Sequence, residues 1–205
     1  GDAGLNRAKL MGNPDHQRQV ENVVVRLLKE RPFYGYFLMQ FRREIRATGE
    51  PVGVTIRHGV PILTVNPELF CSYSYPAQQA LLEHGLKHIL HLHPARQKNY
   101  HSRTWDVACD LAINPTIENL PAEALLPLHF NLPQGLAAEE YVPLLSPLFE
   151  TGNLDGEGIG TADLAGAGRL EPGEDVSAQE EVSFQPIDDH SIWADAVDTP
   201  ESLAE

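Results

Sequence analysis

The chain has 205 residues, a length that suits one domain of ordinary size followed by a tail. Its net charge of -14 is confined to the C-terminal part, because residues 1–149 carry 14 basic and 14 acidic side chains, whereas residues 150–205 carry 15 acidic side chains and Arg169. A neutral body and an acidic tail do not attract phosphate, which argues against nucleic-acid binding. No stretch approaches roughly 18 apolar residues and no signal-peptide pattern is present, so we expect neither a membrane span nor export.

The two cysteines, Cys71 and Cys109, lie in apolar sequence surroundings. They do not make up the disulfide framework that small secreted proteins use. We therefore expect reduced, buried thiols in a cytoplasmic protein.

The first half of the chain predicts two helices and a hairpin. Apolar residues at spacings of three and four predict amphipathic helices over 14–28 and 33–45. Between residues 52 and 66 the sequence changes to two short β-branched runs, separated by His58-Gly59, a pair that suits a turn. These runs predict a β-hairpin.

Two further helices follow. Pro76 suits a first helical turn and Pro94 disfavours further helix, so we expect a helix over 76–93. Ser102 as N-cap and the Asn114-Pro115 pair as stop delimit the next helix. A short helix is expected near 137–145, and residues 151–186 are Gly-rich and acidic, as in a flexible linker.

The helix over 76–93 carries four histidines. At 100° per residue, His84, His88 and His91 share one stripe, whereas His93 lies on the opposite side if the helix is regular to its end. Two histidines four residues apart on one helical face can share one divalent ion. The spacing therefore predicts a metal site that includes His84 and His88.

The following helix offers a third ligand. Asp106, Asp110 and Asn114 lie four residues apart and form a polar stripe on an otherwise apolar helix. This stripe either faces solvent or packs against the histidine helix and brings Asp110 to the ion. A catalytic zinc site takes three protein ligands and one water molecule, and the third ligand here is Asp110 or else His91 or His93.

The position of the usual general base is occupied by glycine. In the H-E-x-x-H pattern of metallopeptidases the glutamate after the first histidine deprotonates the water molecule at the metal, and here that position is Gly85. The nearest acid in sequence, Glu83, lies about 120° from the midline of the histidine pair. The sequence thus supports a metal more strongly than it supports proteolysis.

Five sequence segments in this order resemble a known family: PFYGYFLMQF, PILTVNPELF, LLEHGLKHILHLHPAR, WDVACDLAINPTI and GLAAEEYVPLL. The family is the putative metallopeptidase domain that precedes a von Willebrand factor A-like domain in bacterial proteins, and the resemblance covers most of residues 16–145. DDHSIW at 188–193 resembles the junction toward that second domain.

The resemblance implies a zincin-like α+β fold, with helices packed on a small β-sheet or hairpin and an acidic flexible tail. It implies that His84 and His88 are the motif histidines and that Asp110 and Asn114 match the family signature A-x-D-x-x-x-N, while His93 and Arg96 match the end of its metal-helix pattern. The expected domains are a zincin-like domain at 1–149, a linker at 150–187 and a junction at 188–205.

Two functions remain open at this point. The first is peptide hydrolysis by metal-activated water at a zinc site formed by His84, His88 and Asp110, with another acid as base; Glu83 is the weak candidate, and His91 or His93 could shuttle protons. The second is an inactive zincin-like domain that serves as a protein-interaction scaffold. The expected partners are a protein or peptide and the von Willebrand factor A-like domain.

Overall fold

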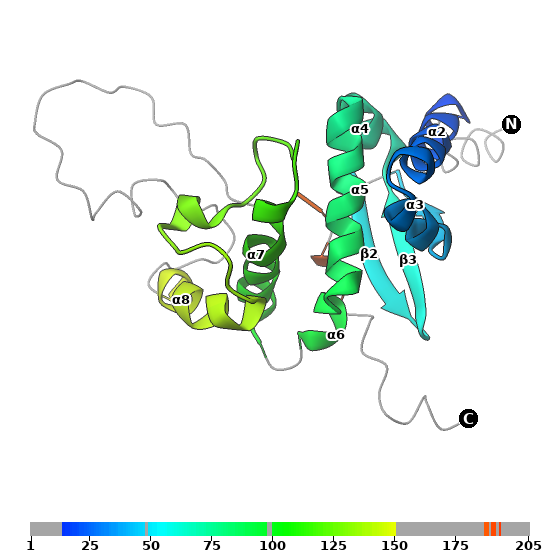
Figure 1. Cartoon of the computed structure of the whole chain (residues 1–205). Helices are drawn as coiled ribbons and strands as arrows, with labels where there is room; N and C mark the ends of the chain where they lie inside the picture. The colour runs from blue at the N-terminus through cyan, green and yellow to red at the C-terminus, as the bar shows by residue number, and fades with distance from the viewer. Residues whose placement is uncertain are drawn as a thin grey trace, which may run out of the picture.

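The protein is described by a computed structural model that covers residues 14–47, 49–97, 100–150, 187, 188, 190, 191 and 193. Within these residues, seven α-helices pack with one three-stranded sheet, which confirms the α+β class (Figure 1). No helix in this part of the chain combines the length and apolar character that crossing a bilayer requires. The expected linker at 151–186 lies outside the described residues.

The N-terminal region is only partly as predicted. Helix α2 (Pro14–Glu30) buries one apolar face, and α3 (Pro32–Met39) follows it. The prediction that the second helix continues to residue 45 is wrong, because Arg42–Ile45 forms strand β1 and pairs in parallel with β3. The ladder supplies hydrogen bonds that helical spacing in the sequence does not reveal, and the mostly exposed, charged residues of β1 suit the edge of a sheet.

The β-hairpin is confirmed. Strands β2 (Val52–Arg57) and β3 (Val60–Val65) pair antiparallel, and His58 and Gly59 both have positive φ, as a tight two-residue turn requires. The strand order β1-β3-β2 leaves β2 at the second edge. Helix α4 (Pro67–Ser72) is not among the predicted elements. It begins with a proline in its first turn, after Asn66 as the cap.

Helix α5 (Tyr75–Leu90) runs through the middle of the molecule. Its predicted end at His93 is wrong, because the chain takes a left-handed conformation at Leu92 and begins the short helix α6 (His93–Arg96). Helix α7 (Ser102–Ile113) has His101 rather than Ser102 as its N-cap.

The rest of the described chain returns along α7. Two 3₁₀ turns, η1 (Asn114–Thr116) and η2 (Pro127–Phe130), lead to helix α8 (Ala138–Glu150), which confirms the expected short helix and extends it. As Figure 1 shows, α7 and α8 lie on one side of α5, and the sheet with α2 and α3 lies on the other.

Two hydrophobic cores reflect this division. The first is built by α2, α3, α5 and the sheet and also contains Ile187; we call it the sheet core. The second is built by α7 and α8 and also contains Trp193; we call it the α7–α8 core. The facing sides of α5 and α7 carry the polar residues that the sequence singles out, so the candidate site lies on the seam between the cores (Figure 1).

Candidate metal centre

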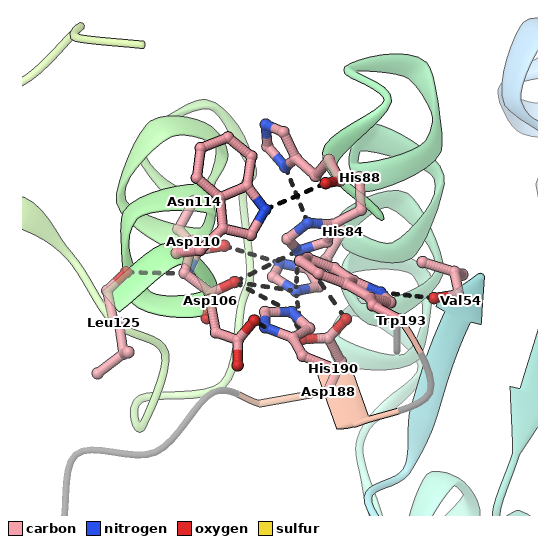
Figure 2. A network of polar contacts seen from close by, with 12 residues as sticks. Val54, His84, His88, Asp106, Asp110, Asn114, Leu125, Asp188, His190 and Trp193 are labelled. Atoms are coloured by element: carbon pink, nitrogen blue, oxygen red, sulfur yellow. Dashed lines mark hydrogen bonds and ion pairs between the residues drawn. The ribbon is translucent and has the colours of Figure 1, made fainter. Parts of the chain in front are cut away.

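Five metal-ligating side chains meet on the seam between α5 and α7 (Figure 2). Each offers a donor atom, and these atoms all lie within 4.8 Å of one another: His84, His88, Asp110, Asp188 and His190. Ligand atoms about 2.1 Å from a common ion lie at most about 4.2 Å apart. The five donor atoms therefore occupy a space close to the size that one ion requires.

Helix α5 aims two imidazoles at this point. The Nε2 atoms of His84 and His88 lie 3.0 Å apart, as their spacing of four residues on one helical face allows. Both side chains are fully buried. Two ring nitrogens thus converge away from solvent, an arrangement that a cation placed between them would stabilise.

Asn114 determines which nitrogen of His84 faces the cluster. Its amide Nδ2 donates to the carbonyl oxygen of Leu125 at 2.8 Å, and that oxygen can only accept. The Oδ1 atom of Asn114 therefore faces His84, and the Nδ1–H of His84 donates to it at 2.8 Å. The Nε2 atom of His84 is left with its lone pair toward the cluster, as a metal ligand needs.

His93 plays the corresponding part for His88. The two Nδ1 atoms lie 3.0 Å apart, and burial lowers the pKa of His93 to about 3, so His93 is neutral. A neutral His93 can accept the Nδ1 proton of His88, and in that tautomer the Nε2 lone pair of His88 faces the cluster. The indole nitrogen of Trp105 donates to the main-chain oxygen of His93 at 3.1 Å. The turn at Leu92 thus brings His93 behind His88, where it supports this ligand without being in the donor cluster.

Carboxylates and an imidazole face the histidine pair with close contacts. His84 Nε2 lies 3.0 Å from Asp188 Oδ1, His88 Nε2 lies 3.3 Å from Asp110 Oδ1, and His190 Nε2 lies 2.6 Å from Asp188 Oδ1. Although these atoms are close enough to attract, both oxygens of each aspartate and both nitrogens of His190 lack a hydrogen-bond partner within the described structure. Asp110, Asp188 and His190 thus approach one another and the histidine pair without hydrogen-bond geometry, an arrangement that suits side chains grouped around a cation.

Burial and charge act in opposite directions on these groups. Burial raises the pKa of Asp110 to about 7, against the attraction of His190 and His84. Burial alone would also raise the pKa of Asp188, but the neighbouring His190, His84 and His88 hold it well below its usual range. Buried charges need a partner, and a divalent cation would neutralise two carboxylates here.

The sequence-predicted residues divide into three groups. His84, His88 and Asp110 lie in the donor cluster. His93 lies behind His88, whereas His91 is exposed at the end of α5 and outside the cluster. The alternatives His91 and His93 for the third ligand are therefore not among the five clustered donors.

Glu83 lies outside the cluster in a different set of contacts. Its Oε2 atom accepts from Arg31 at 2.5 Å, and its Oε1 atom lies 3.0 Å from Lys87 Nζ. Lys87 donates in turn to the main-chain and hydroxyl oxygens of Thr116. Glu83 thus joins α5 to the residue before α3 and is not positioned as a base at the metal centre.

Gly85 is a packing position. A Cβ atom built there would lie 2.9 Å from Cγ1 of Val54, closer than side chains pack. Strand β2 therefore approaches α5 as closely as it does because residue 85 has no side chain. A glutamate at this position would displace Val54 as well as add a carboxylate.

Asp188 and His190 were missed as ligands by sequence reasoning. They lie far along the chain from the two helices, in DDHSIW, which was interpreted as a junction between domains. The Asp-x-His spacing within that segment was the available signal, since both residue types bind divalent ions. His190 is also held from the side by Asp106, with 3.6 Å between Nδ1 and Oδ1.

Trp193 covers the cluster on the side of the sheet (Figure 2). Its ring stacks on His190, with 4.0 Å between ring centroids, and lies 5.1 Å from the ring of His88. Its indole nitrogen donates to the main-chain oxygen of Val54 at 2.7 Å. Together with the neighbouring helices, Trp193 excludes solvent from the donor atoms.

The donor set selects the kind of ion. Imidazole and carboxylate ligands suit zinc and other divalent first-row metals, and the centre contains no thiolate, since Cys109 is buried in the α7–α8 core. Five protein donors exceed the three that a hydrolytic zinc site usually takes.

Comparison with protein families gives one match. The model of a family described as "putative metallopeptidase domain" matches residues 15–191, a range that includes all five donors. Searches among curated proteins and among solved structures give no match.

Proposed function

We propose that this chain, which belongs to the family of putative metallopeptidase domains, binds one zinc ion through His84, His88 and Asp110, with Asp188 and His190 as further donors. The observation that carries the proposal is the convergence of five buried donors, and in three of them neither side-chain polar atom has a hydrogen-bond partner among the described residues. A zinc ion supplies Lewis-acid chemistry when bound, since it polarises a carbonyl oxygen and lowers the pKa of a water molecule.

The residues around the donors prepare the site for a cation. Asn114 and His93 hold the two imidazoles of α5 with their Nε2 atoms toward the cluster, and both contacts are buried. Such outer contacts usually orient metal-binding histidines and raise their basicity. The site is thus preorganised for a metal on the side of α5 and α7.

We propose further that the closed arrangement holds its ion without hydrolysing peptide bonds. All five donors are buried, and five protein donors leave little room for a water molecule and a substrate carbonyl. The glutamate that usually serves as base is replaced by Gly85, and Glu83 is committed to Arg31 and Lys87. These observations favour the second function that the sequence suggests, a zincin-like domain that kept its metal centre and serves as a scaffold for a protein partner.

Peptide hydrolysis is the second candidate, and one observation favours it. His84, His88 and Asp110 come from two helices that pack side by side, and by themselves they make up the three-ligand set of a hydrolytic zinc site. Hydrolysis would then require Asp188 and His190 to withdraw, and Asp106, which is partly exposed beside His190, would be the nearest carboxylate outside the donor set.

Metal content tests the first proposal. We expect about one zinc ion per chain in the purified protein by inductively coupled plasma mass spectrometry, and a loss of zinc in His84→Ala. The matched control is His91→Ala, which removes an exposed histidine from the same helix and should keep the zinc. A wild-type protein that takes up no zinc, even after incubation with the metal, would refute the proposal.

A peptidase assay separates the two candidates. Zinc-loaded protein is incubated with a denatured protein substrate, and fragments are counted by mass spectrometry. We expect no cleavage above the level of His84→Ala. Cleavage that requires His84 would favour hydrolysis over the scaffold.

The setting of the domain is also a proposal. We propose that the domain acts in the bacterial cytoplasm, with residues 151–186 as a linker within the domain and the residues after Trp193 leading toward a von Willebrand factor A-like domain. Two free cysteines and the order of the family-like segments support this arrangement.

A further inference from the structure

We propose that the C-terminal residues Ile187, Asp188, His190 and Trp193 form a metal-dependent clasp, which closes the metal centre and joins the two cores of the domain. We refer to these four residues as the clasp. This inference rests on the proposed function, because it requires a metal ion in the centre.

The clasp contacts both halves of the domain. Ile187 is buried in the sheet core, and Trp193 is buried in the α7–α8 core. Between them, Asp188 faces α5, and its Oδ1 atom lies 3.0 Å from Nε2 of His84. His190 faces α7, and its Nε2 atom lies 3.6 Å from Oδ1 of Asp110. Four neighbouring residues therefore link parts of the chain that otherwise build separate cores.

The clasp is attached by polar contacts that depend on the metal centre. The carboxylates of Asp188 and Asp110 are both buried and offer donor atoms within 4.8 Å of each other, so removing the ion leaves two carboxylates in one buried space, where only the histidines offset their charge. Burying two carboxylates together without a cation is costly. We therefore expect the clasp to detach more readily from the metal-free protein.

Strand β2 accepts a hydrogen bond from the clasp. Val54 lies on an edge strand, and its main-chain oxygen accepts from the indole of Trp193. The same indole stacks on the ring of His190, so displacing His190 would also weaken the hydrogen bond between Trp193 and Val54. The clasp thus occupies the space where an extended peptide would have to lie in order to reach both the edge of β2 and the metal centre.

Two states of the centre follow from this arrangement. With the clasp attached, five protein donors surround the ion and the site is closed. With the clasp detached, His84, His88 and Asp110 remain and the positions of the other two donors are accessible to water. The clasp therefore controls access to the metal, whatever the reaction or partner that uses it.

Hydrogen exchange of the wild-type protein is the primary test. Exchange is followed by mass spectrometry in peptides that contain residues 187–193, with zinc present and after its removal by a chelator. Because zinc binds the attached state at least about tenfold more tightly than the detached state in this scheme, saturating zinc should slow exchange there by at least about tenfold. Peptides from the β2–β3 hairpin turn serve as the internal reference and should change much less.

A double variant tests the donors directly. In Asp188→Ala/His190→Ala, zinc should still bind but at least about tenfold more weakly, and exchange at 187–193 should stay fast with zinc present. Cobalt(II) in place of zinc should show a changed visible spectrum in this variant, because the number of donors falls. His91→Ala, the matched control, should resemble the wild type in all three measurements.

The outcomes distinguish this inference from the proposed function. If the wild type binds zinc but exchange at 187–193 is equal with and without it, the clasp is refuted and the zinc site stands. Unchanged zinc affinity and cobalt spectrum in the double variant would refute it as well. If the wild type binds no zinc, the proposed function fails first. If the double variant does not fold, the wild-type exchange experiment and the single variant His190→Gln still test the clasp. Zinc affinity in His190→Gln should fall in the same direction as in the double variant.

Discussion

Asn114 offers the most direct test of how the fold prepares the metal centre. Its side chain makes two buried contacts of 2.8 Å, one with the imidazole of His84 and one with the main-chain oxygen of Leu125. Asn114→Asp keeps an acceptor for His84 and loses the donor to Leu125, whereas Asn114→Leu loses both. The pair of variants therefore separates support of the metal ligand from support of the fold.

These two contacts determine how much each variant should change the free energy of unfolding and the zinc affinity. A buried carbonyl oxygen without its donor costs about 1 to 3 kcal/mol, so both variants should lower the free energy of unfolding by at least that amount. For a chain of this size, each kcal/mol lowers the melting temperature by about 2 to 4 °C. Loss of the acceptor behind a metal-binding histidine usually reduces metal affinity about 10- to 100-fold. We expect this loss for Asn114→Leu and not for Asn114→Asp, which keeps the acceptor.

The assay is zinc competition against a chromophoric chelator, combined with thermal unfolding of the metal-free variants. Asn114→Asp should bind zinc at least as tightly as the wild type, because a carboxylate makes the imidazole of His84 more basic. Wild-type affinity in Asn114→Leu would refute the argument that Asn114 fixes the tautomer of His84. An equal loss of affinity in both variants would mean that Asn114 acts through packing only.

Three further predictions concern neighbouring residues and the metal. Gly85→Ala should lower the free energy of unfolding by about 1 to 3 kcal/mol through overpacking against Val54, less the roughly 1 kcal/mol that alanine gains in a helix, as measured by urea unfolding; a more stable variant would contradict the close approach. His93→Phe should reduce zinc affinity about 10- to 100-fold in the same chelator competition, because His88 loses its acceptor, and unchanged affinity would argue against that role. Zinc at about 100 times its dissociation constant should stabilise the wild type by about 2.7 kcal/mol in thermal unfolding, an effect that ought to be missing in His84→Ala.

The sequence predicts the part of the site that is local. The spacing of His84 and His88 places both rings on one face of a helix regardless of the rest of the fold, and the structure brings Asp110 to them from the next long helix. Helical spacing could not predict the position of His93, because the left-handed conformation of Leu92 turns the chain back toward His88. Helical periodicity cannot anticipate a break that depends on a single backbone conformation.

The errors in the fold have similar causes. Residues 42–45 continue the helical spacing of α3, yet they form a strand because β3 offers a hydrogen-bonding edge that is distant in sequence. The Asp-x-His spacing marks Asp188 and His190 as residue types that bind metals, but their contacts with α5 and α7 depend on the tertiary fold. Gly85 was interpreted as a lost catalytic position, whereas the close approach of Val54 shows a steric requirement that becomes visible only with the neighbouring strand in place.

The distribution of the donors along the chain also has a consequence during synthesis. His84, His88 and Asp110 leave the ribosome well before Asp188 and His190, which follow Asp110 by roughly 80 residues. At synthesis rates of about 5 to 20 residues per second, this interval lasts on the order of 4 to 16 s. Under the proposed function, a nascent chain has time to bind a metal ion through three donors while the site is still open, and the last two donors enclose the ion afterwards. The order in which residues are made would then load the metal centre before the protein closes it.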